Sequence, residues 1–271
     1  MRRTISLALL SGVMIALAAT LAAGSSRHAA VADEGCSNAS VRGAYGFADQ
    51  GQAFTAGGGE GADIAAAGRI VFDGKGGLTG TEWESFNGAI TTIPFSGEYS
   101  VQPDCTGQTV IHDGQTAHLK FTLVERGQEA NYFITDPGVV AAGQISRVQL
   151  KHCSNATLRG VYSFAASGSA VGASGELGDI AVSARIVFDG RGTATQSTSS
   201  SFNGFQNEAA AESSTYSVNP DCTGSAILSH ADGTMEHINF VIVEGGGELK
   251  FFVNQPGIVF TGTVDKAPLG D

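Results

Sequence analysis

The segment Cys36–Tyr45 reads CSNASVRGAY, and it returns over Cys153–Tyr162 as CSNATLRGVY. Further segments recur at an offset that drifts only from 116 to 119 residues. They are Arg69–Gly74 with Arg185–Gly190, Phe86–Gly88 with Phe202–Gly204, Pro103–Gly107 with Pro220–Gly224, and Pro137–Gly138 with Pro256–Gly257. The chain of 271 residues therefore contains one module used twice, over residues 33–148 and 149–271.

Turns that contain glycine divide each module into short strands. The hairpin dipeptides Asp73-Gly74, Asn87-Gly88 and Asp113-Gly114 tolerate positive φ, and each has a counterpart in the second module. The expected strands are 43–49, 62–73, 77–86, 89–101, 106–112, 116–125, 130–135 and 139–148, then 160–167, 179–189, 192–202, 206–218, 223–230, 235–244, 248–254 and 258–265. Eight strands joined by short turns predict an antiparallel meander, and closure of that meander removes its exposed edges. The expected fold is therefore all-β, with two tandem eight-stranded antiparallel up-and-down barrels.

Alternating apolar residues predict the face of each strand that lines its barrel. On one strand of the first module this face carries Ile64, Ala66, Gly68, Ile70 and Phe72. An eight-stranded barrel is just wide enough to be filled by side chains or to hold one small ligand. The candidate ligand-binding residues are the aromatic residues of the inner faces: Tyr45, Phe47, Phe72 and Phe121, then Tyr162, Phe164, Phe188 and Phe240.

The four cysteines predict one disulfide bond in each module. Cys36 and Cys105 are 69 residues apart, and so are Cys153 and Cys222. Of the three possible connectivities, only this one keeps each bridge within its own copy. The first cysteine of each pair precedes strand one and the second follows strand four, so an up-and-down order puts both at the same end. The opposite rim is then the expected place for function. No Cys-x-x-Cys spacing is present, and no metal site is predicted.

The first 32 residues have the layout of a secretory signal peptide. Arg2 and Arg3 precede an apolar run from Ile5 to Ala23, and Ala30-Val31-Ala32 offers a cleavage site. The remaining 239 residues hold 12 basic and 26 acidic residues, a net charge of −14. Such a surface repels nucleic acid and anionic lipid. We therefore expect a secreted or periplasmic protein that binds neither nucleic acid nor, after cleavage, a membrane.

The start of the first strand, Gly43-x-Tyr45-x-Phe47, resembles the opening of a lipocalin. In that family a Gly-x-Trp packs under a basic side chain from the final strand, and here Arg147 and Lys266 end the final strands. Tyr replaces Trp, and the helix expected after the eighth strand is missing. The resemblance implies a calycin-like barrel, although avidin-type, allene oxide cyclase and dirigent barrels are similarly all-β. The repeated Phe-Asp-Gly and Pro-Asp-Cys-Thr-Gly also resemble uncharacterised secreted bacterial proteins.

Ionisable residues that recur in both modules are the remaining candidates for chemistry. Asp73, Asp104 and Asp113 lie beside Gly or Pro, where a carboxylate accepts hydrogen bonds from the next backbone amides. Glu60 and Asp63 follow Gly57-Gly58-Gly59, in an expected loop at the barrel rim. These two are the best candidates for a recurring polar contact with a ligand or cation.

Two further polar features bear on catalysis. Glu82 and Glu84 flank Trp83 and share one face of their strand, from which Trp83 points away. Paired carboxylates suit sugar binding or acid–base work. His118, which is matched by His237, is predicted to face solvent. The sequence has no nucleophile, phosphate-loop, zinc or haem motif, so no catalytic residue or cofactor is predicted.

Three functions remain open from the sequence. The leading one is an exported, non-enzymatic protein that binds a small apolar molecule in a barrel. The second is an enzyme of the allene oxide cyclase or dirigent kind, which holds a reactive chain in a productive shape and needs a polar group inside, such as Glu98 or Tyr99. The third is a structural or adhesive role at the cell surface, suggested by polar stretches such as Thr195–Ser201. The size and lining of the two lumens distinguish these functions.

Overall fold

The computed structural model describes residues 35–55, 61–171, 177–230 and 233–268. The expected signal peptide, its cleavage site and Glu60 lie outside the described residues. The chain from Gly35 onward forms one compact unit, which contains both modules.

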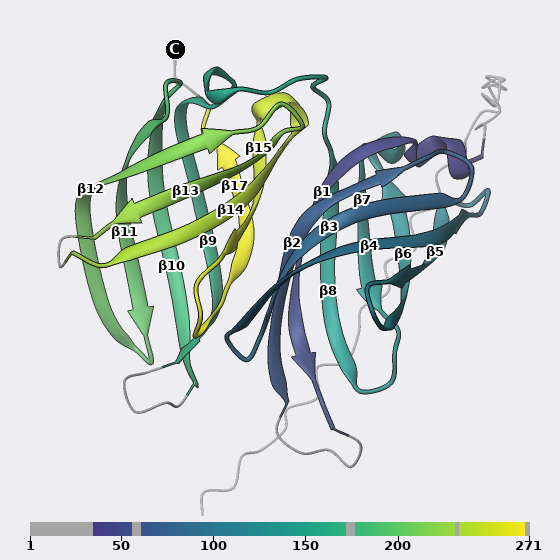
Figure 1. Cartoon of the computed structure of the whole chain (residues 1–271), viewed down its shortest axis with the longest axis horizontal. Coiled ribbons are helices and arrows are strands. Elements are labelled where there is room, and N and C mark those ends of the chain that lie inside the picture. The colour runs from purple at the N-terminus through teal and green to yellow at the C-terminus, as the bar shows by residue number, and fades with distance from the viewer. Residues whose placement is uncertain (1–34, 56–60, 172–176, 231–232, 269–271) are drawn as a thin grey trace, which may run out of the picture. The chain divides into compact units, whose positions relative to one another are not determined.

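Eight antiparallel strands close into the first barrel in the order of the sequence (Figure 1). They are β1 (Gly43–Ala53), β2 (Ala62–Phe72), β3 (Gly77–Phe86), β4 (Ala89–Val101), β5 (Thr106–His112), β6 (Thr116–Val124), β7 (Glu129–Ile134) and β8 (Val139–Arg147). Closure is visible at Tyr45 of β1, which pairs with Ile70 of β2 on one side and Arg147 of β8 on the other. The predicted all-β barrel is confirmed.

The second barrel repeats this order, and its last strand is divided. Its strands are β9 (Arg159–Val171), β10 (Leu177–Asp189), β11 (Thr193–Phe202), β12 (Phe205–Val218), β13 (Thr223–Ser229), β14 (Met235–Val243), β15 (Glu248–Val253), β16 (Ile258–Val259) and β17 (Thr261–Lys266). Both β16 and β17 pair with β9, which closes the barrel. The sequence predicted one continuous strand here. The break falls at Phe260, which is buried and packs against Phe251, with ring centroids 5.9 Å apart.

The expected strand boundaries differ most from the structure at β1 and β9. These strands were expected to end at residues 49 and 167, but they continue to Ala53 and Val171. Apart from Val171, their last residues are polar or small and show no apolar alternation. The backbone pairing nevertheless persists, as between Gln50 and Ala65. Backbone hydrogen bonds, which are independent of side-chain type, extend these strands beyond the sequence signal.

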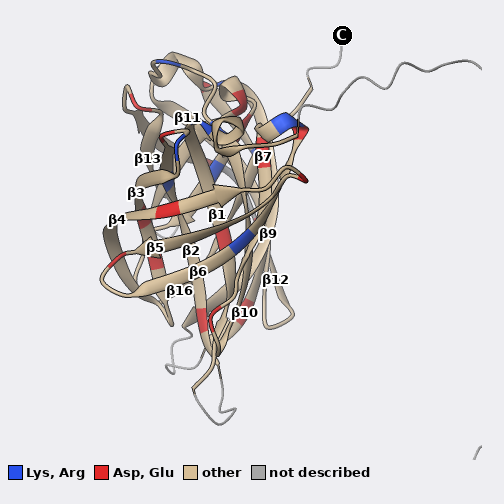
Figure 2. Cartoon of the chain, turned by 90° about the vertical axis from the view of Figure 1, so that its right-hand side faces the viewer, with Lys and Arg blue, Asp and Glu red and all other residues tan. Residues whose placement is uncertain are grey.

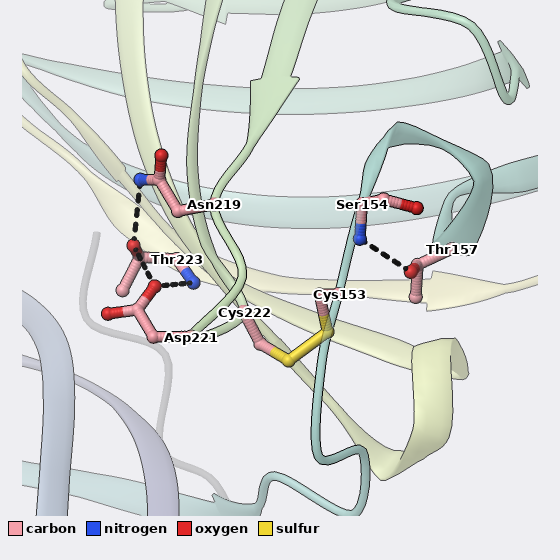
Figure 3. The surroundings of a disulfide bond; sticks show 7 residues. All are labelled: Cys153, Ser154, Thr157, Asn219, Asp221, Cys222 and Thr223. Atoms are coloured by element: carbon pink, nitrogen blue, oxygen red, sulfur yellow. Dashed lines mark hydrogen bonds between the residues drawn. A yellow bond between two sulfur atoms is a disulfide. The ribbon is translucent and has the colours of Figure 1, made fainter.

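Each module has the predicted disulfide bond. Cys36 is bonded to Cys105, and Cys153 to Cys222, with Cα atoms 4.9 Å apart in both pairs. Figure 3 shows how the second bridge joins the segment before β9 to the turn after β12. In that turn, one carboxylate oxygen of Asp221 accepts hydrogen bonds from the backbone N–H of Thr223 at 3.1 Å and from its hydroxyl at 2.7 Å. The bridges lie at one end of each barrel, as strand order required.

In both barrels a basic side chain from the final strand lies over the tyrosine ring of the first strand. The guanidinium carbon of Arg147 lies 4.8 Å from the centre of the Tyr45 ring, and Nζ of Lys266 lies 5.6 Å from that of Tyr162. Arg147 also donates a hydrogen bond to the carbonyl oxygen of Arg42 at 2.6 Å. The final strand is thus held against the start of the first strand by a cation–π contact.

The recurring turn aspartates act as the sequence predicted. Oδ1 of Asp73 accepts hydrogen bonds from the backbone N–H groups of Lys75, Gly76 and Gly77 at 2.6–3.0 Å. These bonds lower the pKa of Asp73. Asp104, Asp113 and the second-module residues Asp189 and Asp221 accept equivalent backbone bonds. Their conserved spacing in the two modules therefore serves turn structure.

Hydrogen bonds and close packing join the outer face of β1, β2 and β8 to the second module. A Cβ atom at Gly46 would lie 2.8 Å from Val243, so this glycine permits close packing. Lys250, which is fully buried, donates from Nζ to Oε1 of Gln144 at 2.9 Å and pairs with Glu248 at 2.7 Å. Burying this lysine is tolerable because it is paired and hydrogen-bonded.

Figure 2 shows acidic positions on strands as well as on loops of the face in view. No helix in the described part of the chain is long and apolar enough to span a bilayer.

Candidate functional site

The first barrel encloses a cavity of about 850 Å³. The cavity reaches the rim opposite the disulfide, where Asp113–Ala117 and Asp136–Val139 contribute to its lining. Apolar side chains form most of its wall, among them Phe47, Ile70, Phe72, Phe95 and Phe121. A chamber of this size and character is typical of a small-molecule site.

Thr109 and several residues of the rim loops add polar groups to the lining. Four further polar side chains lie between the apolar interior and the rim, and we call them the polar belt: Asp49, Glu82, Glu84 and Tyr132. Strand register places three of them in one row. Gly143 of β8 pairs with both Tyr132 of β7 and Asp49 of β1. Ala66 of β2 pairs with both Asp49 and Glu84 of β3. Glu82 follows one step nearer the disulfide end on the same face of β3.

Small residues between these side chains let them approach one another. A Cβ atom at Gly143 would lie 2.7 Å from Oη of Tyr132 and 2.5 Å from Cβ of Asp49. Across this glycine, the Tyr132 hydroxyl donates a hydrogen bond to Oδ2 of Asp49 at 2.5 Å. On the other side of the row, the Thr91 hydroxyl donates to Oε2 of Glu84 at 3.3 Å.

The apolar surroundings change the acidity of the belt. Burial raises the pKa of Asp49 to about 7, although the Tyr132 hydrogen bond opposes the shift. Burial and the neighbouring Asp49 and Glu84 carboxyls raise the pKa of Glu82 to about 8. Burial also raises the pKa of Glu84 and, together with Asp49, that of the Tyr132 hydroxyl. Asp49 and Glu82 therefore hold protons near neutral pH, because ionised groups so close together in an apolar wall are disfavoured.

The belt divides the cavity into two parts. On β1, Tyr45 and Phe47 precede Asp49, and on β2, Ile70 and Phe72 follow Ala66. The part near the disulfide end is therefore apolar and aromatic. The belt lies toward the mouth, so a ligand with an apolar body and one polar group would fit with the apolar end innermost.

The second barrel lacks the polar belt. At the matched positions it carries Ala166, Thr198, Ser200 and Phe251 in place of Asp49, Glu82, Glu84 and Tyr132. The register is the same, since Phe251 pairs with Gly262 and Ala166 pairs with Val182. One structural framework therefore carries two different lumens.

The second lumen is also smaller, with a cavity of about 280 Å³. Phe260 occupies the position of Ala141, and Val182 occupies that of Ala66. Both larger side chains line the second cavity. Side chains therefore fill space that is open in the first barrel.

A separate polar cluster lies at the mouth of the second lumen. Nδ1 of His230 lies 3.0 Å from Oε1 of Glu212, and Nε2 lies 3.4 Å from Oε2 of Glu236. Burial acts to lower the pKa of His230, but the two carboxylates outweigh it and raise that pKa above its usual value. The His230 ring is thus held between two acids.

Six of the eight aromatic residues predicted to bind a ligand line the cavities. Phe47, Phe72 and Phe121 line the first, and Phe164, Phe188 and Phe240 line the second. Tyr45 and Tyr162 are fully buried at the disulfide end and do not line either cavity. Their hydroxyls donate hydrogen bonds of 2.6 Å to the carbonyl oxygens of Gly127 and Gly246. Burial between these partners raises the pKa of both tyrosines to about 12.

The sequence analysis missed Asp49 and Tyr132. Asp49 has the same parity on its strand as Tyr45 and Phe47, so alternation places it inside the barrel. Asp49 is the last residue of the expected strand 43–49, and the sequence analysis did not assign it to the inner face. The shared face of Glu82 and Glu84 was predicted correctly, and it is the lumen face.

Glu98 and Tyr99, the other polar candidates, do not line the first cavity. Glu98, proposed as an inward acid, is on the outer face with its side chain 73% exposed, and it pairs with His112. Tyr99 points inward but donates its hydroxyl to the Asn38 carbonyl oxygen at the disulfide end. The cyclase-type hypothesis therefore loses the acid on which it rested.

Asp63 and His118 are engaged in hydrogen bonds on the outside of the barrel. The Asp63 carboxylate accepts from Gln52 at 2.9 Å and from Ser169 at 2.5 Å. His118 is exposed, as predicted, and its Nδ1 lies 2.7 Å from Oδ1 of Asp136. Within the described ranges, no group of three or more His, Cys, Asp or Glu side chains is arranged to hold a metal ion.

The chain matches no protein-family model and no curated protein. Among solved structures, CghA is 8% identical over 84% of this chain and 90% of its own, with a TM-score of 0.25. An AttH candidate from Nitrosomonas europaea is 9% identical over 86% and 94%, with a TM-score of 0.28. A DUF3598 protein of unknown function from Nostoc punctiforme is 9% identical over 84% and 97%, with a TM-score of 0.26. Likeness at this level carries no argument about function.

Proposed function

We propose that the protein binds one small, largely apolar molecule in the lumen of the first barrel. The observation that carries this proposal is the cavity of about 850 Å³, whose wall is mostly aliphatic and aromatic and whose polar groups lie mainly in the belt and at the rim. A pocket that combines an apolar wall with a small number of placed polar groups suits specific binding of a small molecule.

The second barrel acts mainly as a packed partner. Its cavity of about 280 Å³ offers far less room for a ligand than the 850 Å³ of the first barrel. Its outer face supports the first barrel through buried contacts such as that of Lys250 with Gln144. One ligand per chain is therefore the expected stoichiometry.

Export fits this role. The two disulfide bonds indicate an oxidising compartment, since such bonds are rare in reducing cytosol. Together with the N-terminal sequence pattern, they support the periplasm or the medium as the place where the protein meets its ligand.

The test is a titration with the uncharged fluorophore N-phenyl-1-naphthylamine, whose emission rises in apolar surroundings. The variant Ala117→Trp adds bulk to the cavity wall on β6, at the position that Glu236 occupies in the second barrel. Thr122→Trp adds the same bulk on the exposed outer face of β6 and is the matched control.

The parent and the Thr122→Trp variant should bind one probe per chain with the same affinity. Ala117→Trp should bind it at least about ten-fold more weakly, a loss of about 1.4 kcal/mol. Native mass spectrometry gives the stoichiometry independently. Probe binding that is equal in all three proteins, or absent from the parent, would contradict the proposal.

A further inference from the structure

The lining of the first cavity contains acids and no basic side chain. Its ionisable side chains come from β1, β3, β7 and two rim loops: Asp49, Glu82, Glu84, Tyr132, Asp113 and Asp136. Among the described lining residues there is no Lys, Arg or His. Outside the lining, His118 contacts Asp136 from the outer face, with Nδ1 2.7 Å from Oδ1.

The polar belt lies in an apolar chamber rather than on a solvated surface. Asp49 has one hydrogen-bond partner, the Tyr132 hydroxyl, and Glu84 has a 3.3 Å contact with Thr91. A carboxylate has room for about four hydrogen bonds. The belt therefore keeps unused hydrogen-bonding capacity toward the open cavity.

The polar belt is present only in the first barrel, which has the larger of the two described cavities. The second barrel keeps the same register but has Ala166, Thr198 and Ser200 where the first has carboxyls. A framework role for these acids would apply to both barrels. Their presence only beside the larger cavity links them to what the cavity holds.

We propose that the ligand of the first barrel is an amphiphile with a basic nitrogen, whose ammonium group lies among Asp49, Glu82 and Glu84 while its apolar part fills the space toward the disulfide end. This inference rests on the proposed binding function. An ammonium group supplies the positive charge and the N–H donors that the lining lacks, and charge-assisted hydrogen bonds are the strong ones in such an environment. A carboxylate ligand would find no basic side chain in the described lining to pair with.

Proton release accompanies binding in this arrangement. Burial raises the pKa of Asp49 to about 7 and of Glu82 to about 8, so the empty belt holds protons at pH 7. A bound ammonium favours the ionised carboxylate and expels a proton. Because an alkylamine stays charged below about pH 10, its affinity should rise as the pH increases from 5 to 8.

The experiment compares three ligands that differ only in the head group. Decylamine, decanol and decanoate displace N-phenyl-1-naphthylamine from the parent and from the triple variant Asp49→Ala, Glu82→Thr, Glu84→Ser, which carries the residues of the second barrel. Glu98→Gln, which removes an exposed acid from the outer face, is the matched control.

At pH 7.5, decylamine should displace the probe from the parent and from Glu98→Gln at a concentration about ten-fold lower than decanol, with decanoate weakest. The triple variant should bind the probe but treat decylamine and decanol alike. Calorimetry in two buffers of different ionisation enthalpy should detect proton release with decylamine in the parent and none in the triple variant.

Decanol or decanoate competing as well as decylamine in the parent would overturn the inference, and so would a triple variant that keeps the preference for amine. In either case, retained probe binding would leave the apolar-ligand proposal intact. Failure of the parent to bind the probe at all would instead contradict the proposed function itself.

Discussion

Replacing the three belt carboxyls by the residues of the second barrel should remove most of the pH dependence of the first barrel's stability. The triple variant is Asp49→Ala, Glu82→Thr, Glu84→Ser, and it places at each position a side chain that the same framework already accommodates. The expected result is a free energy of unfolding that changes little between pH 5 and pH 8. The parent should lose stability over the same range.

The sign follows from the direction of the pKa shifts. Burial raises the pKa of Asp49 from 3.8 to about 7 and that of Glu82 from 4.5 to about 8. The folded barrel therefore keeps protons that the unfolded chain has lost, and stability is lost as the pH rises through this window. Each such group lowers the free energy of unfolding by at most about 1.4 kcal/mol per pH unit, and Asp49 accounts for about 4 kcal/mol in total. The two effects do not add fully, because each carboxyl raises the pKa of the other.

The chain carries its own reporter for this measurement. Trp83 is the single tryptophan and lies on β3 of the first barrel, so its fluorescence during urea unfolding follows that barrel alone. Glu98→Gln removes an exposed outer acid and should leave the pH profile of the parent unchanged. The triple variant also loses the Tyr132–Asp49 hydrogen bond, which costs about 1 kcal/mol at every pH. If the free energy of unfolding fell equally with rising pH in the parent and in the triple variant, the reasoning would be refuted.

Three further changes probe the framework. Cys105→Ser opens the bridge to Cys36 and should lower the unfolding free energy of the first barrel by roughly 4 kcal/mol; Trp83 emission would show an early transition, while circular dichroism would still show a folded second barrel. Arg147→Met removes the cation–π contact with Tyr45 and should lower that free energy by about 2 kcal/mol in urea unfolding, and an unchanged midpoint would contradict it. Gly143→Ala puts a methyl group 2.4 Å from a backbone oxygen and should destabilise the same barrel by about 1–3 kcal/mol, whereas wild-type stability would refute the close approach.

Much of the fold follows from the sequence because the duplication repeats each signal. Turn dipeptides, such as Asn87-Gly88, mark the hairpins, and alternation fixes the inner face of β2 from Ile64 to Phe72. The disulfide pairing follows from strand order, since both members of a pair must lie at one end of an up-and-down barrel. The turn and alternation signals are local, and the duplication and strand order supply the disulfide pairing, so none of them requires knowledge of side-chain packing.

The site could be predicted only in part, because it depends on register between distant strands. Asp49 and Tyr132 are 83 residues apart, and they meet only because both pair with Gly143. Cavity size is also not a local property. The difference between the two lumens rests on exchanges such as Ala141 for Phe260, which leave the pattern of alternation unchanged.

The most direct test of the central claim is a crystal structure of the protein grown with 10-bromodecylamine, whose bromine atom is located by anomalous scattering. Our account predicts one bromine peak per chain inside the first barrel, near Ile70, Phe72 and Phe95, with the ligand nitrogen beside Asp49. A first barrel without ligand, with bromine in the second lumen or on the outer surface instead, would contradict the account.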